Sequence, residues 1–130
     1  MKAVHICRGL LQGDFEPIIP LSVCSVTGQI YTQDVIVDTG FNGWLSLPPS
    51  IIAELGLIWK RRGRAILGDG RECIFNVCEA VVLWDAAILT IPLDEADSEP
   101  LIGMSLMEGY QLTVQAIEGG RVELNKLNAV

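Results

Sequence analysis

The sequence is poor in the residues that bind metal ions. It contains one histidine, His5, and four cysteines among 130 residues. The cysteines, Cys7, Cys24, Cys73 and Cys78, include no CxxC pair, so the pattern does not favour a zinc site, and we expect no metal and no other cofactor. Buried, reduced thiols are the expected state, which is typical of a cytoplasmic protein.

Basic residues are also few. Nine Lys and Arg stand against 16 Asp and Glu, which gives a formal net charge of -7. Binding to a phosphate backbone needs clustered Lys and Arg, so we expect no nucleic-acid partner. The one basic run, Lys60-Arg61-Arg62 with Arg64, contains no interleaved aromatic residue and is interpreted as a solvated strand edge.

Long hydrophobic runs are missing too. No apolar stretch approaches the roughly 20 residues of a membrane span, and polar residues interrupt the N-terminus where a signal peptide would be apolar. We therefore expect a soluble protein with no membrane partner. Half of the residues are hydrophobic, enough for a core without disulfides. The length predicts a single domain over residues 1–130, with its core at about 16–127.

The dominant pattern is that of β structure. Runs rich in β-branched residues alternate with Gly, Pro and Asp, which predicts a mainly β domain. A loop is expected at residues 94–100, where an acidic segment breaks the pattern. Strands are expected at residues 18–26, 29–37, 44–47, 58–67, 71–83, 86–91, 110–117 and 121–127.

Glycine-containing turns join the expected strands into hairpins. The turns are Thr27-Gly28, Gly68-Asp69-Gly70 and Gly119-Gly120, since glycine tolerates the positive φ of tight hairpin turns. One short helix is expected with Ser50 as N-cap and Gly56 as its C-terminal stop. A second, of one or two turns, is expected over residues 104–108.

The strongest local signal is Asp38-Thr39-Gly40, directly after the apolar run Val35-Ile36-Val37. A carboxylate at the end of a buried strand is costly unless something uses it. Thr39 can hydrogen-bond neighbouring backbone, and Gly40 allows a sharp turn and a close approach. Taken alone, the tripeptide favours a strand-end Asp that forms an Asx turn.

A second signal, Leu101-Ile102-Gly103, follows later in the chain, ahead of the second expected helix. With Asp38-Thr39-Gly40 and Gly68-Asp69-Gly70 before it, this order resembles the retropepsin family of aspartic peptidases. In that family a D-[ST]-G turn is followed by a flap hairpin and then by a hydrophobic-hydrophobic-Gly segment. The Asp-Thr-Gly-Phe-Asn-Gly sequence of residues 38–43 is similar to a cellular, non-viral branch of the clan. The resemblance covers roughly residues 18–124.

The resemblance implies a closed acid-protease β-barrel with one or two short helices and one lobe per chain. The family carries one catalytic Asp per subunit, and only one D-[ST]-G occurs here, so the implied enzyme is a homodimer. The implied catalytic residues are Asp38, Thr39 and Gly40. Two carboxylates about 3 Å apart would repel by roughly 5 kcal/mol if both were ionised, at an effective dielectric near 20. The pair should therefore hold one proton and activate a water for peptide-bond hydrolysis.

The family also implies how a peptide would bind. Gly68, Asp69 and Gly70 would form a flap that closes over an extended peptide, and Phe41, Ile102 and Gly103 complete the implied substrate-binding set. Side-chain specificity would come from pockets. Candidate pocket walls, for which an ordinary core role is at least as good an interpretation, are Trp44, Leu45, Trp84 and Ile102.

Phe41 departs from the family pattern. Many members carry a small residue, often Ser or Ala, directly after the glycine, and a hydroxyl there can hydrogen-bond the catalytic carboxylate. Phe41 cannot. The alternative hypothesis is accordingly a non-catalytic retropepsin-fold module that binds an extended peptide or pairs two partners.

Overall fold

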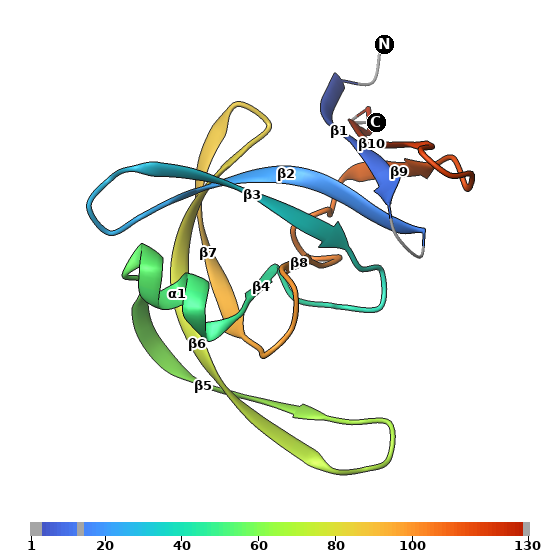
Figure 1. The fold of residues 1–130 in the computed structure, drawn as a ribbon. Coiled ribbons are helices and arrows are strands. Elements are labelled where there is room, and N and C mark those ends of the chain that lie inside the picture. The colour runs from blue at the N-terminus through green and yellow to red at the C-terminus, as the bar shows by residue number, and fades with distance from the viewer. Residues whose placement is uncertain (1–3, 13–14, 129–130) are drawn as a thin grey trace.

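The computed structural model describes residues 4–12 and 15–128. The prediction of a mainly β domain is confirmed, because these residues contain many strands and one helix (Figure 1). The elements are β1 (Val4–Gln12), β2 (Glu16–Cys24), β3 (Ile30–Val37), β4 (Leu45–Leu47), α1 (Pro49–Leu55), β5 (Ile58–Ile66), β6 (Glu72–Trp84), β7 (Ala87–Glu95), β8 (Leu101–Ile102), β9 (Tyr110–Val114) and β10 (Arg121–Lys126).

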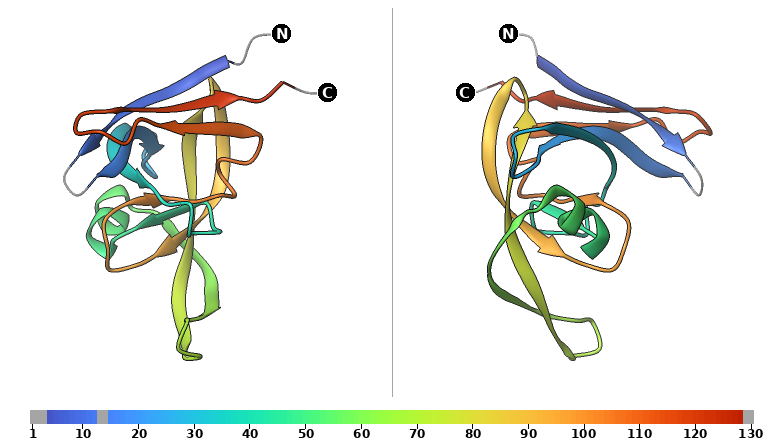
Figure 2. Two further views of the ribbon diagram at one scale, coloured as in Figure 1. Left: turned by 90° about the vertical axis from the view of Figure 1, so that its right-hand side faces the viewer. Right: turned by 60° about the vertical axis from the view of Figure 1, so that its left-hand side comes forward.

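All the strands belong to one sheet, in the order β5-β6-β7-β4-β8-β3-β2-β1-β10-β9. An additional antiparallel pairing of β2 with β6 bends the central part of this sheet into a ring. The ring consists of β6, β7, β4, β8, β3 and β2. At one end β5 extends from the ring, and at the other end β1, β10 and β9 continue the sheet (Figures 1 and 2).

The short strand β8 joins parts of the chain that lie far apart in sequence. It runs parallel to β3, with Val37 opposite Ile102, and antiparallel to β4, with Leu45 opposite Ile102. β8 is thereby inserted between two strands that follow each other along the chain. This insertion brings the two sequence signals, at residues 38–40 and 101–103, to the same place.

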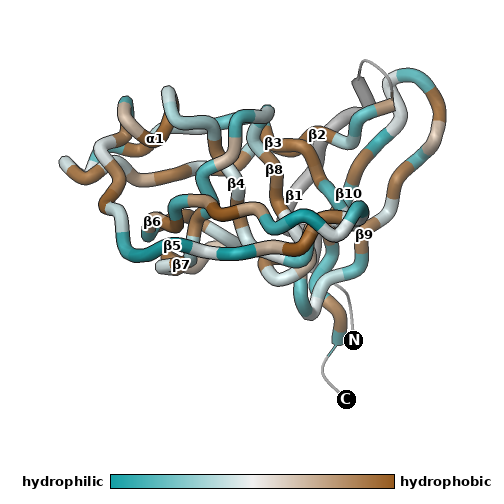
Figure 3. Tube along the Cα trace, turned by 90° about the horizontal axis from the view of Figure 1, so that it is seen from below, coloured by the Kyte–Doolittle hydropathy of each residue, from teal (hydrophilic) through white to brown (hydrophobic). Residues whose placement is uncertain are grey.

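The core is formed by side chains of the ring strands together with side chains of α1 and β10. The strands alternate buried and exposed positions, as expected of strands with one face against a core. Figure 3 shows hydrophobic stretches along β3 and β8 and hydrophilic positions recurring along β5. The fully buried large side chains include Ile19, Val23, Val35, Leu45, Leu47, Leu55, Val82, Leu93, Ile102, Val122 and Leu124.

The helix begins earlier than the sequence predicted. Pro48, not Ser50, is the N-cap residue of α1, and it makes no side-chain capping hydrogen bond. Pro49 is the first helical residue, where its fixed φ suits the helix and its missing N–H costs nothing. The predicted stop is confirmed, because Gly56 adopts a left-handed conformation with φ 68°.

Other predicted boundaries need correction. Residues 104–109 form consecutive turns rather than a helix, with one hydrogen bond of helical spacing, from Met107 N–H to the Gly103 carbonyl. β7 continues through Asp94 and Glu95, which we expected in a loop, because both residues pair with β4. The strand β1 was not predicted at all; it pairs with β10 and β2.

The hairpin predicted around Gly68-Asp69-Gly70 is confirmed. β5 and β6 are antiparallel, and the turn is closed by hydrogen bonds between Leu67 and Arg71 and from Gly70 to Leu67. The outer part of this hairpin, residues 61–76, is called here the hairpin arm, and both views of Figure 2 show it projecting beyond the rest of the molecule. No helix among the described residues is long and apolar enough to cross a membrane.

Candidate active site

Asp38 lies directly after β3, where the chain leaves the ring. Its N–H donates a hydrogen bond to the Ile102 carbonyl oxygen at 3.0 Å, which ties the residue to β8. Its Oδ1 accepts a hydrogen bond from the Gly40 N–H at 2.9 Å, the geometry of an Asx turn. Among the residues that the structure describes, none donates a hydrogen bond to Oδ2. Asp38 is half-buried, and Thr39 and Gly40 are exposed beside it.

The segments on either side of β8 are joined by a dense set of hydrogen bonds. We call residues 38–44 together with 101–105 the junction. Besides the Asp38 bond, the N–H groups of Gly103, Met104 and Ser105 donate to the carbonyl oxygens of Trp44, Phe41 and Gly43 at 3.1, 2.8 and 3.1 Å. The Ser105 hydroxyl donates to the Asn42 carbonyl oxygen at 2.5 Å. The position of Asp38 is thus fixed by backbone groups from both segments.

Gly103 is required by this close approach. A Cβ at this position would lie 2.6 Å from the Phe41 carbonyl oxygen, 2.7 Å from the Phe41 ring and closer still to the Gly43 carbonyl oxygen. Side-chain carbon atoms do not come so near to backbone oxygens, so no other residue fits without separating the two segments.

The unusual Phe41 is accommodated by a second glycine. A Cβ at Gly43 would lie 2.5 Å from the tip of the Phe41 ring. The ring therefore covers the bare backbone of Gly43 and Gly103. In the Phe-Asn-Gly sequence after Asp38-Thr39-Gly40, the large Phe41 side chain therefore requires the glycine two positions later.

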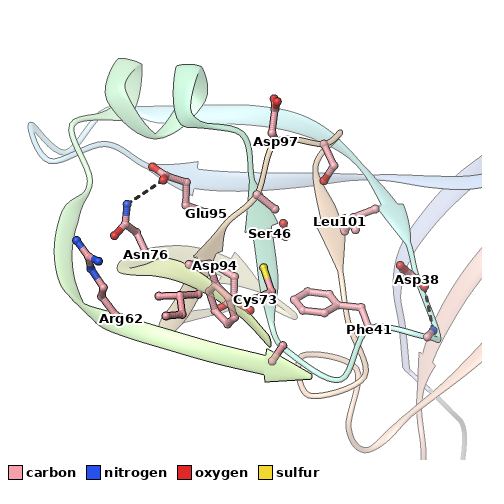
Figure 4. A pocket seen from close by; sticks show the side chains of 16 residues that line it. Asp38, Phe41, Ser46, Arg62, Cys73, Asn76, Asp94, Glu95, Asp97 and Leu101 are labelled. Carbon is pink, nitrogen blue, oxygen red and sulfur yellow. Dashed lines mark hydrogen bonds between the residues drawn. The ribbon is translucent and has the colours of Figure 1, made fainter. Parts of the chain in front are cut away.

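Asp38 opens onto a pocket with a volume of about 750 Å³. The pocket lies between the junction and the hairpin arm (Figure 4). Such a volume is in the range of small-ligand and peptide side-chain sites. Its lining residues are Asp38, Gly40, Phe41, Ser46, Arg62, Ala65, Cys73, Ile74, Phe75, Asn76, Asp94, Glu95, Ala96, Asp97, Ser98 and Leu101.

The predicted site residues separate into groups. Asp38, Gly40 and Phe41 line the pocket, whereas Ile102 is fully buried and Gly103 is covered by Phe41. The turn of the hairpin arm, Gly68-Asp69-Gly70, does not line it.

At the tip of the arm, Asp69 is engaged with its own turn. It accepts hydrogen bonds from the Arg71 backbone N–H and guanidinium at 3.0 and 2.5 Å. These two interactions lower the pKa of Asp69. The arm instead meets the pocket through side chains farther down its two strands, including Ala65 and Ile74.

The candidate pocket walls belong to the core. Leu45 and Ile102 are fully buried, Trp84 is 6% exposed, and Trp44 packs against the same cluster. None of the four lines the pocket. Their contacts in the structure are those of core packing, the alternative interpretation.

Sequence reasoning missed the polar side of the pocket. Ser46 lies between Leu45 and Leu47 on β4. Successive side chains of a strand point to opposite faces, so the Ser46 side chain points away from the face on which Leu45 and Leu47 lie. Asp94 was expected in a solvated loop but is half-buried and lines the pocket. Burial raises the pKa of Asp94, and the nearby Arg61 partly offsets this effect.

The cysteines are not uniformly buried as predicted. Cys78 is buried, Cys24 is half-buried, and Cys73 is exposed on the hairpin arm, where it lines the pocket. Burial and the neighbouring Glu95 raise the pKa of the Cys78 thiol, which disfavours the reactive thiolate. The side chains of Cys7 and His5 lie outside the part that the structure describes.

No protein-family model matches the chain, and no curated protein matches it either. The chemistry that the site can perform follows from its geometry. A carboxylate that lines a pocket, with one oxygen that accepts no hydrogen bond from the described residues, can accept a proton from water or bind a donor group of a ligand.

Proposed function

We propose that the chain is one subunit of a homodimeric aspartic endopeptidase with a closed, retropepsin-like β domain. The observation that carries this proposal is the placement of Asp38, fixed by the hydrogen bonds of the junction and facing a pocket bounded on its far side by the hairpin arm. Two of the three segments on which the family resemblance rests, residues 38–40 and 101–103, contribute to this pocket. The hairpin that carries the third segment lines the pocket with residues of its strands rather than of its turn, and this arrangement supports the resemblance.

The second carboxylate would come from a second copy of the chain. Asp94 lies in the same pocket, but Figure 4 shows Phe41 between it and Asp38. Thr39 and Gly40 are exposed next to Asp38, so the Asp38 turn is accessible to a symmetry mate. A two-fold axis beside this turn would bring two identical carboxylates together.

The proposed chemistry needs only those two groups and water. Two adjacent carboxylates cannot both be ionised without strong repulsion, so they share one proton. The charged carboxylate takes a proton from a water molecule, and the protonated one donates a hydrogen bond to the peptide carbonyl. The water oxygen attacks the carbonyl carbon, the C–N bond then breaks, and the leaving amine takes the proton that the carboxylate received from the water. No covalent enzyme intermediate forms.

The hairpin arm would hold the substrate. It extends beyond the body of the molecule, and its strand β5 is an edge strand of the sheet, which suits the addition of an extended peptide. The arm would close over the peptide and exclude water. The cytoplasm remains the proposed compartment, on the cysteine pattern of the sequence.

Cleavage of a mixed peptide library tests the proposal. We expect pepstatin-sensitive cleavage that Asp38→Asn reduces by on the order of a thousandfold or more, because general acid–base catalysis is lost. Asp34→Asn, an equal charge change at an exposed position of β3, is the control and should retain activity.

Two outcomes would contradict the enzyme. One is hydrolysis that survives Asp38→Asn, and the other is a protein that stays monomeric at micromolar concentration and above. Peptide binding without turnover, unaffected by Asp38→Asn, would instead favour the non-catalytic module suggested by Phe41.

A further inference from the structure

The pocket contains a polar pair that the proposed catalytic chemistry does not use. β4 and β7 are parallel, and Ser46 is the register partner of Asp94. Residues in register on neighbouring strands point to the same face of a sheet, and both side chains line the pocket. Figure 4 shows them in the middle of the pocket, beyond Phe41 as seen from Asp38.

Ser46 is a buried hydroxyl without a partner. The residue is 3% exposed, and its Oγ makes no hydrogen bond with any residue that the structure describes. Buried polar groups are nearly always hydrogen-bonded, so a hydroxyl left unpaired at a pocket wall indicates that a bound group completes it. A ligand donor that reaches this depth would also reach Asp94.

The charged residues of the pocket wall indicate that the ligand carries a positive charge. Four carboxylates line it, those of Asp38, Asp94, Glu95 and Asp97, against one guanidinium, that of Arg62. Burial penalises the charged form of Asp94 and raises its pKa, even with Arg61 nearby. A cation held beside Asp94 would offset this penalty.

The carboxylates do not converge on a metal ion. Among the described residues no group of three or more His, Cys, Asp or Glu side chains is arranged to hold one. Glu95 is also engaged elsewhere, since it accepts a hydrogen bond from the Asn76 side chain at 2.9 Å. Charge spread along a wall suits an organic cation better than a compact ion.

Much of the remaining wall is apolar. Phe41 and Leu101 line the pocket from the junction, and Ile74 and Phe75 line it from the hairpin arm. An apolar passage that leads to a carboxylate matches a side chain with an aliphatic stem and a cationic end. Lysine and arginine have this construction.

We propose that the pocket is a subsite for a lysine or arginine side chain of the peptide substrate, with Asp94 and Ser46 receiving its cationic end. This rests on the proposed endopeptidase function and adds its substrate class. The ammonium or guanidinium donates hydrogen bonds to the Asp94 carboxylate and the Ser46 hydroxyl. Phe41 and Leu101 contact the stem.

The first test is the cleavage profile of the peptide library. We expect lysine and arginine to be enriched at one position relative to the cleaved bond, with about tenfold faster cleavage of a lysine peptide than of its norleucine counterpart. Asp94→Asn should reduce this preference to about twofold, Ser46→Ala should reduce it less, and Asp34→Asn should leave it unchanged. Cleavage that depends on Asp38 but shows no basic preference would overturn the subsite and leave the peptidase standing.

The second test does not require turnover. N-acetyl-lysine methylamide and N-acetyl-norleucine methylamide are titrated into the wild-type protein, and backbone amide shifts are followed by NMR. We expect the lysine probe to bind about tenfold more tightly, with its largest shifts near Ser46 and Asp94, and to lose this advantage in Asp94→Asn. Equal binding of both probes, or shifts confined to other regions, would overturn the subsite. Selective lysine binding without any hydrolysis would contradict the peptidase function but not the subsite.

Discussion

The junction and the hairpin arm face each other across one pocket, yet they are built in opposite ways. In the junction, backbone hydrogen bonds link residues 38–44 to residues 101–105, and Gly103 leaves no room for a Cβ. In the hairpin arm, all of whose residues the structure describes, Gly63 alone is buried. Local stability follows buried contacts, so the junction should be rigid and the arm free to open. A site that fixes a carboxylate and admits a long substrate needs both properties.

In both regions, nevertheless, an aromatic ring packs over glycine backbone. Phe41 covers the backbone of Gly43 and Gly103 in the junction, and Phe75 covers Gly63 across the two strands of the arm. An aromatic ring over a strand glycine restores the apolar contact that the glycine lacks. Both rings line the pocket, so each glycine also determines the shape of the site.

The largest expected difference between the regions is at their glycines. Gly103→Ala should lower the free energy of unfolding by about 3 kcal/mol, because backbone oxygens block its Cβ. Gly68→Ala, at the tip of the arm, meets nothing within 4 Å and should change it by about 0.5 kcal/mol or less. Urea unfolding of both variants measures the contrast. Equal effects would show that the junction is not the more tightly packed region.

A smaller effect is expected inside the arm. A Cβ at Gly63 would lie 2.5 Å from the Phe75 ring, which is a side chain and can move. Gly63→Ala should therefore cost about 1 kcal/mol and shift Phe75 into the pocket. Peptide binding should weaken while the unfolding free energy falls only modestly. A loss of stability as large as that of Gly103→Ala would show that the arm is packed as tightly at Gly63 as the junction is at Gly103.

The smallest effect concerns Asp94, on β7 between the two regions. Its folded pKa lies above the ordinary 3.8, so its protonated form contributes stability at low pH that is lost as the pH rises through the folded value. Asp94→Asn removes the buried charge and should raise the free energy of unfolding at pH 7 by roughly 0.5 kcal/mol, after allowance for solvent screening and the lost Arg61 interaction.

That gain should shrink as the pH falls and be absent below about pH 3.8, where Asp94 is protonated in both states. Unfolding curves at several pH values, with Asp34→Asn as the control, measure it. A variant that is less stable than wild type at pH 7 would contradict a desolvated carboxylate. It would point instead to an interaction with Arg61 that supports the fold.

Much of the fold could be predicted because its signals are local. Several predicted features depend only on near neighbours in the sequence, and each is present. They are the alternation in β2 and β3, the turns at Gly28 and Gly70, and the helix stop at Gly56. The strand β1 was missed because it depends on distant partners, β10 and β2, and carries no strong local pattern.

The candidate site was predictable only in part, for a related reason. Asp38 follows an apolar strand, which is a local signal, whereas Ser46 and Asp94 meet through a parallel pairing of strands that are distant in sequence. The dependence of Phe41 on Gly43 and Gly103 also appears only when β8 is inserted between β3 and β4. The hydrophobic period and the composition of the sequence do not specify which residues of distant strands pair with each other.

The most direct test of the proposed enzyme is a crystal structure of the assembled protein, read at the two Asp38 side chains. We predict a symmetric dimer in which their carboxylate oxygens lie within hydrogen-bonding reach, about 3 Å apart. An assembly that keeps the two carboxylates well separated, or a protein that crystallises and sediments only as a monomer, would contradict it.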